Sequence, residues 1–233
     1  MKFKLKFFVS HLIISLLVAI LMASFVFWVW YPSPLASAVG VGTIFIMMLG
    51  IDVILGPLLT LLVAKKGKKT LKMDLLVIAI IQIGALLYGV YNISITRPVY
   101  IVYDNTRFDL VQANHLDSKI SYYGKPRLVA IKPPANDDEN MKRVNDELET
   151  GMSPSLNTDL YQDIELSRAQ ITANKKPLSE LTQYNDAQIV QSALEKYEQV
   201  AGFFPLRTTN LDVTVLVDDK GGVVKIVDLR PWQ

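Results

Sequence analysis

The sequence predicts an α+β protein in two parts. Residues 1–95 are expected to form a three-helix transmembrane bundle, and residues 96–233 an external domain with an antiparallel sheet and one or two helices. Three observations support this prediction. Three apolar stretches of membrane-crossing length lie in the first part, and nearly all its charges fall outside them. The second part contains short alternating segments joined by Asp-, Asn- and Gly-rich turns, which are typical of hairpins. It also contains stretches with helical spacing of apolar residues.

The basic residues of the first part occur in two clusters. One is Lys2, Lys4 and Lys6, and the other lies within 65–72; the turn 31–34 between the first two apolar stretches carries no charge. Positively charged loops stay on the cytoplasmic side of a membrane. The pattern therefore predicts a multi-pass protein of the bacterial inner membrane, with a cytoplasmic N-terminus and a periplasmic C-terminal domain. The first part has a net charge of +6 and the second −4, so no basic surface for nucleic acid is expected.

The expected spans are about 7–30, 43–64 and 75–93. A cleavable signal peptide is the rival interpretation of the first span, because 36–38 (Ala-Ser-Ala) resembles a cleavage site. A signal core is usually only about 7–15 residues long, which favours an uncleaved anchor. Residues 35–42 exceed what one crossing requires and are expected to lie at the membrane interface.

Asp52 is the informative residue of the bundle, because a carboxylate in the membrane must find a partner. Counted from Lys65 it lies about 18 Å from the inner surface, and Gln82, counted from Lys72, about 15 Å. We therefore predict a hydrogen bond between Asp52 and Gln82. His11, about 7 Å deep, does not match their depth. The pair either locks the bundle, or Asp52 receives a polar group from a partner's transmembrane helix.

Gly56 and Pro57 follow Asp52 on the same predicted helix. Proline removes a backbone hydrogen bond and kinks a helix, and the freed carbonyl near Val53 must be satisfied within the membrane. This helix face is therefore expected to be packed against protein. Ala85 and Gly89 form a small-xxx-small pair that permits close packing of helices, most simply within the bundle.

The external domain is expected to begin with two strands in a hairpin and to end with a second hairpin. The Asp/Gly-rich turn 218–222 of the second makes it the most clearly predicted one. Val223 and Lys225 lie on its last strand, and an edge strand there offers unpaired backbone groups to a partner. Residues 151–184 show no clear periodicity. The expected strands are 99–103, 107–112, 128–131, 211–217 and 223–229, and the expected helices are 136–151 and 189–201.

The sequence shows no catalytic pattern. It has no cysteine, and its two histidines are predicted to lie in different compartments, where they cannot share a metal. The acidic run 137–139 lacks the spaced ligands of a calcium loop and fits a solvated helix start. No enzyme activity, cofactor or metal is therefore expected.

Several blocks, read in order, resemble the TfpX/TfpZ family of type IV pilin accessory proteins. The most specific are 51–60 (Ile-Asp-Val-Ile-Leu-Gly-Pro-Leu-Leu-Thr) and 227–232 (Val-Asp-Leu-Arg-Pro-Trp); 30–32, 68–72 and 97–100 support them. The resemblance covers most of the chain, except roughly 133–184. It implies a chaperone or accessory factor for pilin stability, pilus assembly or surface display.

The predicted spans make membrane lipid one partner, and the resemblance implies a second, the major type IV pilin, which presents a membrane helix and a periplasmic head. Two linked contacts would raise the affinity for such a subunit. The alternative is a membrane-tethered periplasmic sensor or ligand-binding protein, although the predicted cytoplasmic segments are too short for an output domain. A cell-envelope enzyme would require a cleft with paired carboxylates.

Overall fold

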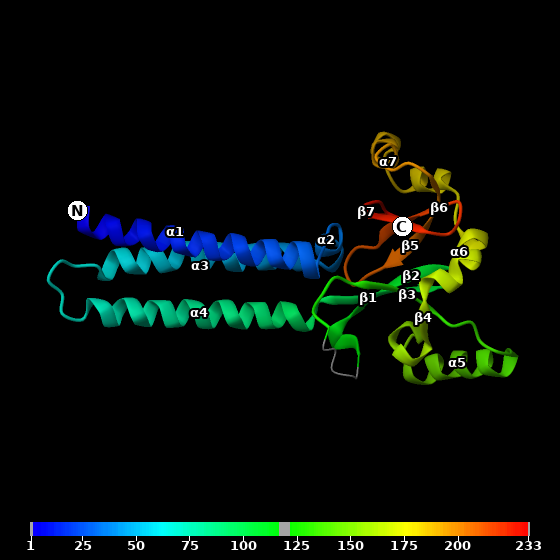
Figure 1. The fold of residues 1–233 in the computed structure, drawn as a ribbon, viewed down its shortest axis with the longest axis horizontal. Coiled ribbons are helices and arrows are strands. Elements are labelled where there is room, and N and C mark those ends of the chain that lie inside the picture. The colour runs from blue at the N-terminus through cyan, green and yellow to red at the C-terminus, as the bar shows by residue number, and fades with distance from the viewer. Residues whose placement is uncertain (1, 117–121, 233) are drawn as a thin grey trace. The chain divides into compact units, whose positions relative to one another are not determined.

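The computed structural model describes residues 2–116 and 122–232. The chain forms two compact units (Figure 1). The helical unit comprises residues 1–29 and 41–96, and the sheet unit comprises residues 30–40 and 97–233. The sheet unit therefore includes the loop that connects the first two long helices.

The helical unit contains three long helices, α1 (Lys2–Phe25), α3 (Val41–Val63) and α4 (Leu71–Ile95). A π-helical turn, Val26–Trp30, extends α1. By length and composition, 2–30, 41–63 and 71–95 could each cross a membrane. Their apolar side chains are mostly exposed in the isolated chain, as lipid-facing side chains would be. Helix α3 packs against both α1 and α4 and continues through Pro57.

The first loop contains structure that the sequence did not predict. Residues 35–42, whose interfacial position stays a prediction, contain a short helix, α2 (Leu35–Val39), ended by Gly40 with a left-handed φ of 79°. Leu35 and Ala38 are buried in the core of the sheet unit. The sequence set this segment apart from the span at 43–64 but did not predict its place in the core of the sheet unit, because that core joins residues far apart in the chain.

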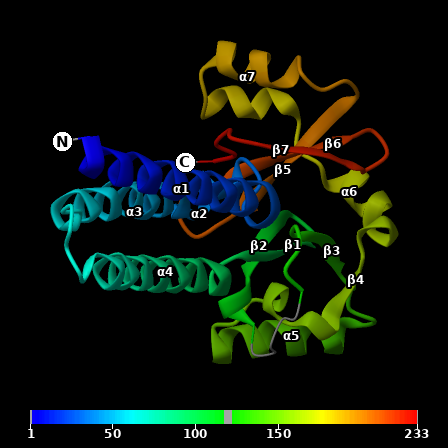
Figure 2. The ribbon, with the colours of Figure 1, turned by 60° about the vertical axis from the view of Figure 1, so that its left-hand side comes forward.

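The α+β class is confirmed. Among the described residues the sheet has seven strands, in the order β4-β3-β1-β2-β5-β6-β7 (Figure 2). It is mixed, which corrects the expected antiparallel arrangement: β1 pairs with β3, and β2 with β5, in parallel. Both predicted hairpins, β1–β2 and β6–β7, are present and antiparallel. The strands are β1 (Pro98–Asp104), β2 (Arg107–Gln112), β3 (Arg127–Ile131), β4 (Tyr161–Asp163), β5 (Val200–Arg207), β6 (Val213–Asp218) and β7 (Val223–Val227).

Helix α5 (Asp137–Thr150) has the predicted ends. The Asn136 side chain caps its first turn, and Gly151, with a left-handed φ of 68°, ends it. The sheet unit also contains α6 (Arg168–Asn174) and α7 (Ala187–Leu194). The predicted helix 189–201 is wrong at its end, because the chain leaves the helix after Leu194 and Val200 begins β5.

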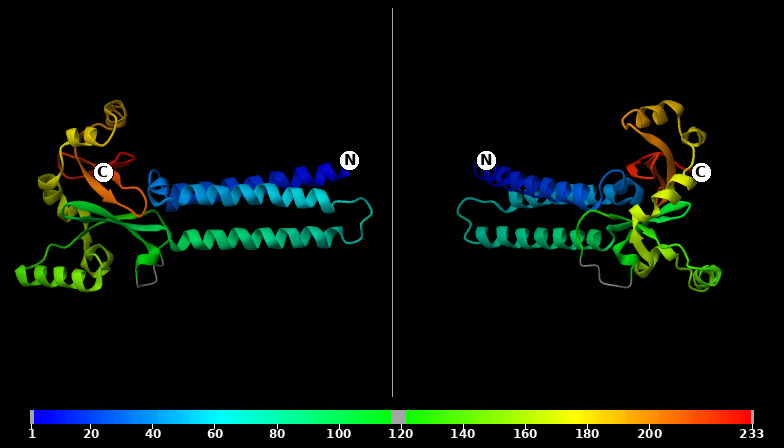
Figure 3. Two further views of the ribbon diagram at one scale, coloured as in Figure 1. Left: turned by 180° about the vertical axis from the view of Figure 1, so that it is seen from behind. Right: turned by 45° about the vertical axis from the view of Figure 1, so that its right-hand side comes forward.

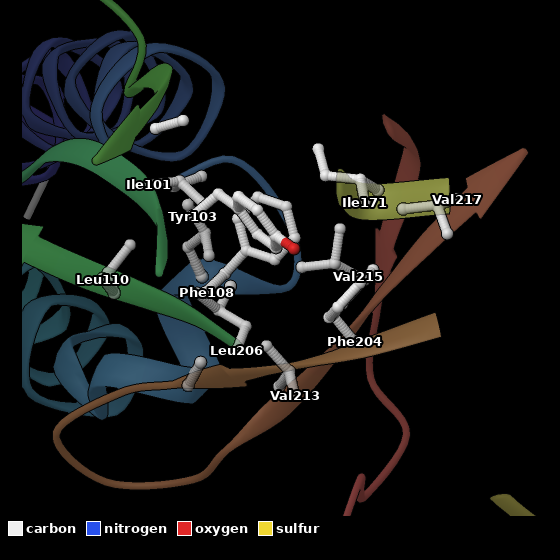
Figure 4. Packing of buried hydrophobic residues seen from close by; sticks show 13 residues of the cluster. Ile101, Tyr103, Phe108, Leu110, Ile171, Phe204, Leu206, Val213, Val215 and Val217 are labelled. Carbon is white, nitrogen blue, oxygen red and sulfur yellow. The ribbon is translucent and has the colours of Figure 1, made fainter. Parts of the chain in front are cut away.

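Alternating side chains of the central strands build a core on each face of the sheet. On one face, Tyr103, Phe108 and Phe204 form a cluster of aromatic rings with centroids 5.2–5.8 Å apart (Figure 4). Helices α2 and α6 contribute Leu35, Ala38 and Ile171 to this core. On the other face, Phe203, Leu216 and Val227 pack with α7 and the 3₁₀ segment Leu178–Gln183.

Candidate functional site

A groove of about 220 Å³ lies among the three long helices. Apolar side chains from α1, α3 and α4 make up most of its lining, for example Val18, Leu49 and Leu86. Asp52 and Gln82 line the same groove, so the structure brings together the two polar residues that the sequence places at one depth.

The contact between these two residues differs in detail from the prediction. The side-chain amide nitrogen Nε2 of Gln82 donates a hydrogen bond to the backbone carbonyl of Asp52, at 2.9 Å, and not to its carboxylate. Gly56 makes room for this contact, because a Cβ at that position would collide with the Gln82 side chain. Pro57 has no backbone N–H to donate to the Val53 carbonyl, which lacks its helical hydrogen bond for that reason. The Gln82 amide of α4 donates to the neighbouring carbonyl, that of Asp52.

The Asp52 carboxylate itself accepts no hydrogen bond from any residue in 2–116 or 122–232. A carboxyl group among apolar side chains is costly unless a donor or a proton satisfies it. The groove thus combines an apolar lining with one carboxylate that has no hydrogen-bond donor among the described residues.

His11 also lines this groove, and its Nδ1 lies 2.6 Å from the Thr60 hydroxyl oxygen. This contact between α1 and α3 was missed from the sequence. A signal for it exists, since Thr60 is five residues from Lys65, about 8 Å deep, and His11 is five residues from Lys6. Matching depths across helices would have found the pair.

Of the predicted small-residue pair on α4, Ala85 and Gly89, only Gly89 packs against another helix. Gly89 is buried, and a Cβ there would overlap the Met48 side chain of α3. Ala85 is exposed. Helices α3 and α4 therefore approach closely at two points: Gly89 of α4 leaves room for Met48, and Gly56 of α3 leaves room for Gln82.

The second candidate surface lies along β7, the last strand of the sheet. Val223 and Lys225 both belong to β7; Lys225 is exposed and Val223 is half-buried. An open groove of about 810 Å³ runs beside this strand, between α7 and the turn at Pro34. Ile189 of α7 lines it and is exposed. No strand of the described sheet covers the outer side of β7.

The main buried charge cluster of the sheet unit has a structural role. Asp109, only 3% exposed, accepts from Arg107 Nε at 3.1 Å and from Arg207 Nε at 2.9 Å. Asp109 and Arg207 are register partners in the parallel β2–β5 pair, so the ion pair supports a ladder that has few paired residues. Burial raises the pKa of the neighbouring Asp104 carboxyl, and repulsion from Asp109 raises it further. Within 2–116 and 122–232, no three His, Cys, Asp or Glu residues cluster as metal ligands do.

These features define a class of protein: three helices of membrane-crossing length joined to a mixed-sheet unit, with a groove in the helices and an uncovered sheet edge. The family model described as Fimbrial assembly protein FimB matches residues 1–40. Three relatives come from Dichelobacter nodosus. "Fimbrial assembly protein, serogroup I" is 29% identical over 96% of this chain and 94% of its own length. "Fimbrial assembly protein, serogroup E1" is 28% identical over the same shares.

The third relative, "Fimbrial assembly protein, serogroups C1 and C2", is 41% identical over 96 residues, which are 40% of this chain and 73% of that protein. The chain belongs to the fimbrial assembly protein family. No solved structure matches it.

Proposed function

We propose that this protein is a non-enzymatic inner-membrane accessory factor, or chaperone, that helps to assemble type IV fimbriae by holding the fimbrial subunit, the pilin. Membership of the fimbrial assembly protein family supports a role in fimbrial assembly. The resemblance of 51–60 and 227–232 to the TfpX/TfpZ family supports the pilin as the partner. The observation that carries the proposal is the Asp52 carboxylate, which lines an apolar groove among the helices without a donor from the described chain.

The groove suits a single partner helix. Its apolar lining would contact the partner's apolar side chains, and Asp52 would accept a hydrogen bond from a polar group at matching depth. The carboxyl group of a glutamate on a pilin helix, when protonated, is such a donor. The hydrogen bond from Gln82 holds α3 and α4 together through the backbone. The Asp52 side chain is therefore available for a partner without weakening this contact.

The proposed orientation follows from the lysines. The lysines at 2–6 and 65–72 favour the cytoplasmic side of the membrane, which supports a periplasmic sheet unit. Alkaline phosphatase fused after residue 233 is expected to be active, because this reporter requires the periplasm. Activity of a cytoplasmic reporter at the same position would refute the orientation and, with it, access to a pilin head.

The decisive test replaces Asp52 by Asn and by Leu in the full chain. Because the bond from Gln82 uses the backbone, both variants are expected to accumulate to wild-type levels. We expect Asp52→Leu to lose co-purification with the pilin in detergent, and Asp52→Asn to weaken it. Asp74→Asn is the matched control, since Asp74 pairs with Lys68 at the helix end and lies outside the groove. Unchanged pilin recovery with Asp52→Leu would refute the proposal, and loss of the protein itself would assign Asp52 a structural role.

The proposal includes a second contact, in which an extended segment of the pilin head pairs with the edge of β7 beside Val223 and Lys225. Edge strands offer backbone groups for such pairing, and the adjoining groove would take the side chains. A photo-crosslinking amino acid at position 225, which is exposed on β7, is expected to capture the pilin, and one at position 166, which is exposed on another segment of the sheet unit, serves as the control. Equal capture at the two positions would exclude pairing beside Lys225.

A further inference from the structure

Helix α5 carries its apolar side chains on the outside. Met141, Val144 and Leu148 follow the spacing i, i+3, i+7 and are 61%, 45% and 78% exposed. Figure 3 shows α5, in light green, standing out from the strands of the sheet unit. We call these three residues the α5 stripe. An apolar helix face normally packs onto the domain that carries it, so an exposed one marks a contact surface.

The opposite, polar face holds α5 to the sheet unit. Arg143 donates from Nη1 to the Lys132 carbonyl at 2.7 Å and from Nη2 to Glu139 Oε1 at 2.5 Å. Glu139 in turn accepts from the Ala135 backbone N–H through Oε2, at 2.8 Å. Turning the α5 stripe inward would break the bonds to Lys132 and Ala135, whereas the bond between Arg143 and Glu139 lies within α5 and would turn with the helix. The outward orientation is therefore built into the helix and its N-terminal cap.

Carboxylates border the α5 stripe on both sides. At 100° per residue, Asp138 and Glu149 lie along one side of it and Glu147 along the other. The helix as a whole has six carboxylates and only two basic residues, so it accounts for the acidic balance of the second part of the chain. A second copy of this face would bring carboxylates together, and an anionic lipid surface would repel it. The charges instead fit a partner with positive side chains beside its apolar ones.

We propose that the α5 stripe binds an amphipathic helix of another protein, whose apolar seam is bordered by Lys or Arg. Two antiparallel or parallel helices of this kind bury their seams against each other and pair their bordering charges, as in helix-to-helix recognition generally. This contact is separate from the groove of the helical unit and from the β7 edge. It gives the protein a third surface, with its own partner chemistry.

The first test places a photo-crosslinking amino acid at position 148 of the full chain in cells. Leu166 is the matched control, because it is a similarly exposed leucine, at 74%, on another segment of the same unit. We expect position 148 to capture a helical segment with an apolar seam and basic borders, identified by mass spectrometry. Capture of a second copy, of lipid or of an acidic segment, or a yield no higher than at 166, would overturn the proposal.

The second test measures the recognition chemistry with purified full-length protein in detergent. The probe is a labelled amphipathic peptide with a leucine seam bordered by lysines, and its isomer has glutamates in their place. The lysine peptide is expected to bind more tightly, to weaken in high salt, and to lose about tenfold in affinity with Leu148→Ser. Leu166→Ser should leave binding unchanged, and neither exposed-site variant should alter thermal unfolding. Equal binding of the two peptides, or no effect of Leu148→Ser, would refute the proposal.

Discussion

The first loop should contribute to the stability of the sheet unit, because its side chains belong to the core of that unit. Leu35 is 2% exposed and belongs to the same core cluster as Phe204 and Val213. Truncating a fully buried leucine to alanine costs about 3 kcal/mol, because it removes apolar contact and leaves a cavity. For a unit of this size, that loss lowers the melting temperature by about 10 °C.

The assay is thermal unfolding of full-length Leu35→Ala in detergent, followed by near-UV circular dichroism and by protease cleavage within the sheet unit. Leu62→Ala is the control, because Leu62 is 68% exposed on α3 and should leave the transition unchanged. A melting temperature for Leu35→Ala within 2–3 °C of wild type would refute the assignment of the loop to this core.

The same reasoning applies to a fragment that begins at residue 97. In the full chain, the Ala38 carbonyl accepts from Thr208 Oγ1 at 2.8 Å, Leu211 N at 3.0 Å and Asn210 N at 3.2 Å. The fragment would lack this acceptor as well as Leu35. We expect it to unfold at a lower temperature than the sheet unit of the full chain, and adding residues 30–40 through a flexible linker to restore stability. An equally stable fragment would show that the loop is dispensable.

Three further predictions test other parts of the structure. Gly56→Ala should loosen the packing of α3 on α4 and lower the melting temperature of the protein in detergent. Gly50→Ala is the control, because a Cβ there meets open space and should leave the melting temperature unchanged. Equal melting temperatures for the two variants would contradict the close approach at Gly56. Asn185→Ala should lower the free energy of unfolding by about 1–3 kcal/mol, because the side chain bonds both the N–H and the carbonyl of Arg230; urea titration measures this. Burial raises the pKa of Tyr103 to about 12, so the stability that its neutral phenol contributes is complete below pH 10, the ordinary value, and is lost as the pH rises towards 12. Tyr103→Phe should flatten this alkaline loss in denaturant titrations, and an unchanged pH profile would count against it.

The elements that sequence predicted well are those whose signals are local. Charge and hydropathy located the three long helices, and the turn residues between strands located both hairpins, β1–β2 and β6–β7. The capping side chain of Asn136 and the left-handed Gly151 set both ends of α5. Each signal involves residues within a few positions of one another, so no knowledge of the tertiary structure was needed.

The elements that sequence missed depend on distant contacts. Strand β5 contains Gly202 and Pro205, which weaken a strand pattern, and apolar spacing up to residue 201 imitated a longer helix. Its parallel pairing with β2 is limited to Leu206 and Arg207, so Pro205 lies outside that ladder. The parallel pairs β1–β3 and β2–β5 join segments separated by other elements, and no local pattern reports them.

The candidate groove shows the same division. Depth along each helix was enough to bring Asp52 and Gln82 together, because a helix converts sequence distance into membrane depth. Depth alone could not show whether the Gln82 amide would reach the backbone or the side-chain oxygen of Asp52. That choice depends on the rotation of α3 about its axis and on the room that Gly56 leaves for the Gln82 side chain. The difference has a functional consequence. Had Gln82 bonded the carboxylate, every change at Asp52 would have weakened the bundle, and its two candidate roles could not be separated by mutation. Because the bond reaches the backbone, loss of pilin binding in a fully accumulated Asp52→Leu protein would be assigned to the Asp52 side chain and not to a lost Gln82 contact.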